Sequence, residues 1–257
     1  MAVQFDAVKE MTDSVSKVFQ RRNWLLGAPV LAGIFIMYVV IIVVGLIVIG
    51  PQWFKTIASG GSQTPDVTPA FAVGFAIGMT VLVVFVLAVN MFTYAWTLGA
   101  AVGVWQGHDP AFDRGFNLAA VKLVRLVAYQ ILVGLIAIVS IITIVGPIVI
   151  GVLSIYGPAY IVLGNRSATA AIGDSFRLAS ENIAPTIVLV LGFVVAVIAA
   201  IIPVGILGLI PGVGLFVQLA FQWLFAAWVA IAVVRFYELL TIATGEPPFA
   251  LVPETRA

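Results

Sequence analysis

Long apolar tracts separated by short polar segments form the pattern of this chain. Four tracts contain no charged residue: 24–49, 70–104, 126–163 and 183–234. A membrane-spanning helix needs about 20 apolar residues, so the first two tracts predict one helix each and the longer last two predict a helical hairpin each. The pattern therefore predicts an all-α integral membrane bundle of six transmembrane helices, built from three hairpins.

Glycine and proline mark the turns that we expect in the two longest tracts. Gly146-Pro147 interrupts the third tract, because proline cannot continue the preceding helix and glycine adopts unusual backbone dihedrals. Residues 203–214, PVGILGLIPGVG, interrupt the fourth tract. Both turns are apolar, so we expect them to lie shallowly in the far leaflet and not to reach water.

The longest polar interruption in the second half, residues 164–185, predicts an amphipathic surface helix with Ser167 as N-cap. An apolar stripe at helical spacing lies beside charged positions, and it consists of Ala168, Ala171, Ile172, Phe176, Ala179 and Ile183. Asn182 suits the start of the helix that follows. The candidate membrane-surface residues are Ser175, Phe176, Arg177 and Asn182.

Residues 1–22 predict a second amphipathic surface helix. Its apolar stripe lies above basic residues, as in interfacial helices, and consists of Phe5, Val8, Val15, Val18 and Phe19. Two interpretations of such helices stay open. They either cover the cytoplasmic end of the bundle or bind lipids specifically.

Residues 111–123, AFDRGFNLAAVKL, align with residues 171–183, AIGDSFRLASENI, at a shift of 60. The amino terminus gives a weaker third match, in which Asp13-Ser14-Val15 is similar to Asp174-Ser175-Phe176 and Asn23 precedes its span as Asn182 precedes its own. We therefore predict two or three parallel pseudo-repeats, each a cytoplasmic amphipathic helix followed by a hairpin. Inverted-repeat transporters have a different symmetry.

Composition and charge agree with a membrane location. The chain has 63% hydrophobic and 9% charged residues, whereas soluble domains contain about 25% charged residues. Eleven of the twelve Lys and Arg residues fall on one side of the expected topology, with Lys55 alone opposite. Because basic residues favour cytoplasmic loops, we expect both termini in the cytoplasm and the protein in a prokaryotic inner membrane. The net charge of +1 argues against nucleic acid as a partner.

These segments divide a single transmembrane domain, residues 1–257. The parts are the amphipathic helix 1–22, spans one and two in 24–104, a surface helix with spans three and four in 111–163, a surface helix with spans five and six in 167–240, and an extended tail, 244–257.

Candidate chemistry is sparse. Zero cysteines exclude disulfides and thiolate chemistry. Asp174-Ser175 resembles part of a lipase-type GDSL block, but a catalytic serine of that kind needs a histidine and a strand-to-helix turn. His108, the one histidine, lies near Asp109 and Asp113, a spacing more typical of a turn and an N-cap than of a metal site. We expect no catalytic, cofactor or metal residues.

Small and uncharged polar residues predict helix packing. The second span carries one ridge of small residues, which consists of Gly74, Gly78, Gly99 and Gly103. Asn90 lies on its other side, so we expect this span to be central. Hydrogen bonds between helices are the expected role of Asn90, Gln130, Gln218 and Gln222. A pump would require an ionisable residue within its spans. The predicted spans contain no Asp, Glu, Lys, Arg or His.

The segment AIGDSFRLASEN, residues 171–182, and RFYELL, residues 235–240, resemble a broad prokaryotic family of six-span proteins. This family includes the membrane domain attached to some glycerophosphodiester phosphodiesterases. The resemblance implies fold and membrane location. It implies no phosphodiesterase activity, because the chain has no soluble catalytic segment and no second histidine.

The sequence supports two functional hypotheses. The first is a non-catalytic structural or accessory subunit, or lipid-interacting scaffold, with membrane lipids and a larger complex or homo-oligomer as partners. The second is a transporter or permease for an apolar or amphipathic small molecule or lipid, since several prolines break the spans: Pro147, Pro158, Pro203 and Pro211.

Overall fold

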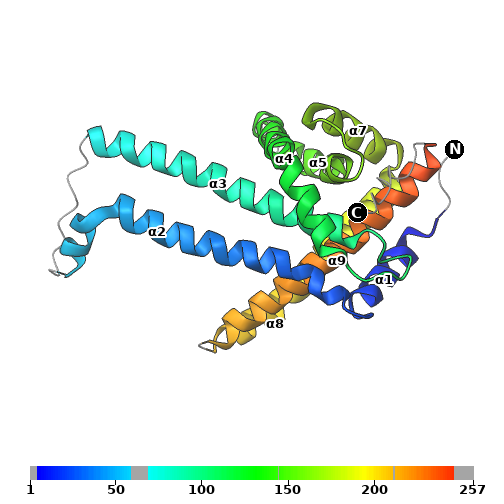
Figure 1. Cartoon of the computed structure of the whole chain (residues 1–257), viewed down its shortest axis with the longest axis horizontal. Coiled ribbons are helices and arrows are strands. Elements are labelled where there is room, and N and C mark those ends of the chain that lie inside the picture. The colour runs from blue at the N-terminus through cyan, green and yellow to red at the C-terminus, as the bar shows by residue number, and fades with distance from the viewer. Residues whose placement is uncertain (1–4, 59–68, 144, 211, 246–257) are drawn as a thin grey trace, which may run out of the picture.

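A computed structural model describes residues 5–58, 69–143, 145–210 and 212–245, and its regular structure is helical (Figure 1). The all-helical prediction is confirmed, and within these ranges five helices are long and apolar enough to cross a membrane, which fits a multi-pass membrane protein. The elements are α1 (Ala7–Val18), the 3-10 helix η1 (Asn23–Gly27), α2 (Ala28–Ala58), α3 (Pro69–Ala101), α4 (Phe112–Ser140), α5 (Gly146–Leu153), α6 (Gly157–Val162), α7 (Ala168–Glu181), α8 (Ile183–Gly208) and α9 (Val213–Ala243).

The segment expected as the fourth span is broken. It forms two short helices, α5 and α6, which together cover 17 residues, Gly146–Val162. Pro158 explains the break, because it has no N–H for the carbonyl of Ser154 and its ring clashes with the carbonyl four residues earlier. In place of a sixth long helix, the second hairpin returns through a kinked pair.

The boundary between surface helix and span differs between the units. The sequence predicts a separate surface helix over residues 111–123, but α4 runs unbroken for 29 residues. In the later unit, Asn182 adopts φ −126° and ψ 50° and separates α7 from α8. Lys122, which aligns with Asn182, keeps the helix intact since it is a good helix former.

Consecutive helices are separated by turns near the glycine and proline positions of the sequence. The first occupies the residues between Ser140 and Gly146, and Pro147 falls in the first turn of α5, where its missing N–H costs nothing. Pro203 lies inside α8, so the second turn begins only after Gly208. Gly212 has φ +81° there. Gly245, with φ +74°, follows the end of α9, while tail residues 246–257 lie outside the described ranges.

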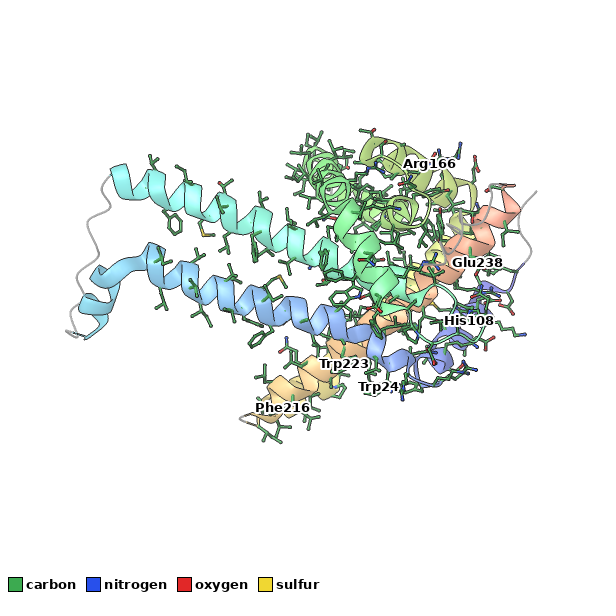
Figure 2. The ribbon with its side chains drawn as sticks, in the orientation of Figure 1. Trp24, His108, Arg166, Phe216, Trp223 and Glu238 are labelled. Atoms are coloured by element: carbon green, nitrogen blue, oxygen red, sulfur yellow. The ribbon has the colours of Figure 1, made fainter. Side chains whose placement is uncertain are left out.

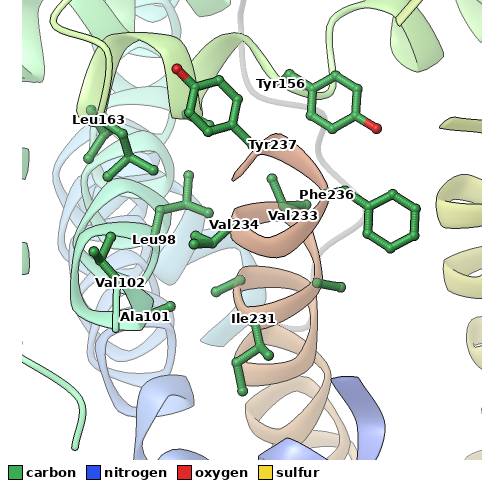
Figure 3. Packing of buried hydrophobic residues seen from close by; sticks show 14 of the residues in the cluster. Leu98, Ala101, Val102, Tyr156, Leu163, Ile231, Val233, Val234, Phe236 and Tyr237 are labelled. Atoms are coloured by element: carbon green, nitrogen blue, oxygen red, sulfur yellow. The ribbon is translucent and has the colours of Figure 1, made fainter. Parts of the chain in front are cut away.

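The buried core lies at the end of the molecule where the hairpins meet, away from their tips (Figure 1, Figure 3). Three helices, α3, α6 and α9, supply most of it. The rings of Tyr160 and Tyr237 meet edge to face, with centroids 4.9 Å apart. Residues seen together in Figure 3 include Leu98, Ala101, Val102, Leu163, Ile231, Val233, Val234 and Phe236.

Glycine permits a close helix crossing between α3 and α4. A Cβ added at Gly115 would lie 2.3 Å from the carbonyl oxygen of Trp96 and 2.7 Å from the amide nitrogen of Ala100. A Cβ at Gly99 would lie 2.8 Å from the Cα of Gly115. The two backbones therefore touch at a point where no side chain fits.

We expect Gly115→Ala to lower the free energy of unfolding by about 1–3 kcal/mol, the usual cost of overpacking. Gly134→Ala is the matched control on the same helix, because a Cβ there meets nothing within 4 Å and alanine favours the helix by about 1 kcal/mol. Thermal unfolding in detergent measures both. Equal stability of the two variants would contradict the close crossing.

Candidate functional site

The break between α5 and α6 is surrounded by hydroxyl groups from neighbouring helices. The hydroxyl of Tyr129, on α4, donates to the carbonyl of Ser154 at 2.5 Å. The Oγ of Ser175, on α7, donates to the carbonyl of Leu153 at 2.7 Å and accepts from the N–H of Tyr156 at 3.2 Å. Backbone groups that the break releases are thus paired by side chains.

Tyr156 and Thr186 extend this cluster to α8. The Tyr156 hydroxyl lies 3.3 Å from Thr186 Oγ1, which itself donates to the carbonyl of Asn182 at 2.8 Å. Tyr129, Tyr156, Ser175 and Thr186 are all buried. We call these four residues the hydroxyl cluster, and it joins α4, α6, α7 and α8 at one point.

Gly157 allows Tyr129 to reach the break. A Cβ at Gly157 would lie 2.0 Å from the Tyr129 hydroxyl and 2.1 Å from the ring carbon that carries it. Any side chain at this position would push the tyrosine away from Ser154. The Gly157-Pro158 pair therefore both breaks the helix and makes room for the group that pairs the broken backbone.

The chemistry of the hydroxyl cluster is hydrogen bonding between neutral groups. Ser175 is buried and both hydrogen-bonding roles of its oxygen are engaged with backbone. The preceding carboxylate, Asp174, contacts the guanidinium groups of Arg166 at 3.1 Å and Arg177 at 3.5 Å. The Asp174-Ser175 pair is therefore a packing and ion-pairing element, and this geometry does not fit an activated nucleophile.

Lys122 holds the other end of α6. It is buried, and its Nζ donates to the carbonyl of Val162 at 2.8 Å. One turn later, Arg125 donates to the side-chain oxygen of Asn165 at 3.1 Å. A cation at a helix carboxyl end is favourable because it satisfies the last carbonyls and opposes the helix dipole. Helix α4 thus fixes α6 at both ends.

A second polar cluster joins the amino and carboxyl regions of the chain. Arg235, on α9, pairs with Glu10, on α1, at 2.8 Å and with Glu238 at 3.5 Å. Its guanidinium carbon lies 4.7 Å from the centre of the Trp105 ring. Gln106 donates to Glu238 at 3.2 Å. Figure 2 shows Glu238 and Arg166 at the end of the molecule opposite the α2–α3 tip.

The predicted surface residues divide between these environments. Ser175 belongs to the hydroxyl cluster, Phe176 is half-buried and Arg177 is exposed. The side chain of Asn182 donates to the carbonyl of Leu178 at 3.0 Å. It therefore ends α7 and does not cap the start of α8, where the side chain makes no capping bond. The predicted N-cap at Ser167 is confirmed, since its Oγ accepts from the N–H of Ala170 at 3.3 Å.

The predicted glycine ridge is not continuous. Gly99 is buried against α4, but Gly103 lies beyond the end of α3, with φ +93° and next to His108. Gly74 meets nothing within 4 Å, and Gly78 is half-buried. A single helical ridge cannot include Gly103, because the chain leaves the helix before reaching it.

The polar residues of the spans lie near the protein surface. Asn90 and Gln218 are exposed, and Gln130 and Gln222 are half-buried. Their hydrogen bonding between helices stays a prediction. Sequence analysis missed Tyr129, Thr186 and Lys122 as members of the site. The Gly157-Pro158 pair was the signal for the break, but only the three-dimensional packing places hydroxyls beside it.

No protein-family model, no curated protein and no solved structure matches this chain. The resemblance to the membrane domain of glycerophosphodiester phosphodiesterases therefore stays a prediction from residues 171–182 and 235–240. The geometry of the helices and their polar contacts is the basis for a functional proposal.

We expect Ser175→Ala to lower the free energy of unfolding by about 1–3 kcal/mol, because it leaves the Leu153 carbonyl and the Tyr156 N–H buried and unpaired. Ser180→Ala is the matched control, since Ser180 lies on the same helix and is exposed, and surface substitutions usually change stability by less than about 0.5 kcal/mol. Chemical denaturation in detergent measures both. A neutral Ser175→Ala would show that the break is paired in another way.

Proposed function

We propose that the protein is a non-catalytic, multi-pass membrane scaffold whose surface helices bind the lipid interface. The orientation of apolar and polar faces on α1 is the observation that carries this proposal. One flank of α1 packs on the bundle through Met11, Ser14 and Val18, which are buried. A second apolar stripe lies next to the first and is exposed.

That second stripe consists of Val8, Val15 and Phe19, which are 63%, 43% and 67% exposed. At about 100° per residue these three fall within about 40° of one another, and Lys17 lies about 180° away. This helix packs on the bundle with one flank, and its exposed apolar stripe and its cation lie on opposite sides. An interfacial helix has this arrangement, and its apolar face enters the headgroup region by about 5–10 Å.

The other two units support the same interpretation. In the three aligned segments a buried small residue is followed directly by a larger apolar one: Ser14-Val15, Gly115-Phe116 and Ser175-Phe176. Phe116 is 44% exposed, close to the value of Val15, and Phe176 is half-buried. A residue that follows the buried one lies about 100° around the helix, so each unit places an apolar side chain at the same flank.

Contacts of the small residues support three parallel repeats. Gly115 touches α3, the returning helix of the first hairpin, and Ser175 touches the α5–α6 break, the return of the second. Ser14 accepts a hydrogen bond from Trp228 of α9, the return of the third, at 2.7 Å. The surface segments that carry Gly115 and Ser175 thus pack on the hairpin that precedes each of them. Helix α1 has no preceding hairpin and packs on the last one.

Charge placement supports entry of all hairpins from the cytoplasmic side of a prokaryotic inner membrane. Arg125, Arg166 and Arg235 make polar contacts with Asn165, Asp174 and Glu10, and Figure 2 shows Arg166 at the end of the molecule opposite the α2–α3 tip. Positive residues favour the cytoplasm, so both termini belong there. Lipids are then the direct partners, and a larger membrane complex or a homo-oligomer would assemble on the scaffold.

The alternative, a permease for an apolar or amphipathic molecule, is favoured by one observation. Broken helices such as α5–α6 often form the substrate sites of transporters. Native mass spectrometry after gentle extraction distinguishes the two. Stoichiometric protein partners support the scaffold, whereas a lone protein carrying one selected lipid or small molecule supports the permease.

The absence of cysteine from the sequence allows a direct test of the interfacial helix. We expect an environment-sensitive dye on Val15→Cys, in phospholipid vesicles, to emit at shorter wavelength and to be quenched by lipids that carry a nitroxide near the headgroup end of the acyl chain. Ser16→Cys is the control, because Ser16 is exposed and about 100° away around the helix. Equal quenching at both positions, or none at either, would contradict the proposal.

A further inference from the structure

The exposed side chains at the tips of two hairpins are mainly apolar among the described residues. At the α4–α5 tip, Ile142 is 88% exposed, and at the α8–α9 tip, Leu209 is 84% exposed. Neighbouring exposed residues are Ile141, Val145, Ile148, Ile210, Val213 and Phe216. Neither tip contains a charged residue. Such surfaces are costly in water.

Several backbone groups at these tips are paired within the tip itself. At the first tip, the N–H groups of Ile141, Thr143 and Gly146 donate to carbonyls three residues earlier, and the Thr143 hydroxyl also donates to the Ser140 carbonyl. At the second, Leu209 and Ile210 do the same. A turn can lie in hydrocarbon only if its polar groups are satisfied internally, and these turns approach that condition.

The returning segment of the second hairpin is too short to cross a bilayer. The segment Gly146–Val162, which comprises α5, α6 and the break between them, contains 17 residues, which span at most about 26 Å at 1.5 Å per residue, and the break shortens this further. The hydrocarbon core is about 30 Å thick. With α6 fixed in the core at the cytoplasmic end, α5 cannot reach the far surface.

A contact between two tryptophans limits how far the third hairpin can extend into the bilayer. Trp223 of α9 donates to the backbone carbonyl of Trp24, and the ring centroids are 5.6 Å apart. Trp24 begins the first apolar tract, just after Arg21 and Arg22, so it marks the cytoplasmic interface. From Trp223 to the start of α9 at Val213 only about 15 Å of helix remains, half of the hydrocarbon thickness.

The first hairpin has no such limit. Its two helices cross where Gly33 meets Thr93, and a Cβ at Gly33 would lie 2.6 Å from the Thr93 methyl. From Thr93 to the start of α3 at Pro69 there remain about 36 Å of helix. Figure 1 shows the α2–α3 hairpin projecting furthest from the core, with α8 and α9 inclined to it.

We infer that the α4–α5 and α8–α9 hairpins are re-entrant: their tips end inside the bilayer against lipid acyl chains, and the α2–α3 hairpin alone crosses it. This inference rests on the proposed membrane location and refines the predicted six spans to two crossing helices and two hairpins that enter and leave on the cytoplasmic side. The occupant of the tip surfaces is hydrocarbon, because the tips combine apolar side chains with internally paired turns.

Single-cysteine variants of the full-length protein in native membrane vesicles test the inference. The variants are Ile142→Cys and Leu209→Cys at the tips, with Ser62→Cys, in the polar sequence that links α2 to α3, as the crossing control. A membrane-impermeant maleimide is added from each side in turn. We expect Ser62→Cys to react from the far side only, and the tip cysteines to react from neither side until detergent is added.

Fluorescence quenching by lipids that carry a nitroxide shows whether lipid or protein contacts the tip side chains. Dye-labelled Ile142→Cys and Leu209→Cys should be quenched most strongly by nitroxides near the acyl chain end. Far-side reaction of the tip cysteines at the level of Ser62→Cys would overturn the inference while leaving the membrane location intact. Protection without lipid quenching would overturn it in favour of a second copy of the chain. Failure of Ser62→Cys to react from the far side would contradict the proposed topology itself.

Discussion

Pro158 imposes the constraint on which the arrangement of the second and third units depends. A membrane protein must pair its backbone polar groups internally, and Pro158 withholds the N–H that a continuous helix would offer to Ser154. The N–H of Gly157 donates to the Ser154 carbonyl at 3.1 Å, and Tyr129 and Ser175 supply further donors to the carbonyls of Ser154 and Leu153 from two other helices. Because those helices are distant in sequence, the break is stable only when α4 and α7 are packed against it. The local backbone geometry of the break therefore depends on the tertiary packing of α4 and α7.

Small residues bring these partners within hydrogen-bonding distance. Gly157 leaves room for the Tyr129 ring, and Gly115 lets α4 touch α3. Lipid tails are as apolar as leucine, so helices in a bilayer associate through close packing and hydrogen bonds more than through the hydrophobic effect. This accounts for the position of the core. It forms where the surface helices bring small residues and hydroxyls from different helices together.

Hydropathy predicted most of the architecture because lipid requires long apolar helices with satisfied backbones. The five long helices and the surface helix that begins at Ser167 follow from that pattern. The pattern could not show that α4 is continuous, since the difference between Lys122 and Asn182 acts through local helix propensity. Gly103 was misassigned to a helix because GxxxG spacing cannot reveal that the helix ends first. The site was less predictable than the fold, because Tyr129 and Lys122 lie on α4 and Thr186 lies on α8, and no spacing in the sequence relates these residues to the broken backbone. Ser175 was recognised as a surface-helix residue, but the structure places it facing inward, where both of its hydrogen-bonding roles are used.

The backbone carbonyls beside the hydroxyl cluster already accept hydrogen bonds. This observation bears on the choice between scaffold and permease. In transporters with broken helices, freed carbonyls and helix ends bind the substrate or the coupling ion. Here the carbonyls of Leu153 and Ser154 already accept hydroxyl donors, and Lys122 occupies the carbonyl of Val162 at the far end of α6. A substrate could use these groups only by displacing buried partners, each at a cost of about 1–3 kcal/mol. The break therefore acts as a fixed joint that turns α6 into the core, which favours a static scaffold over a moving gate.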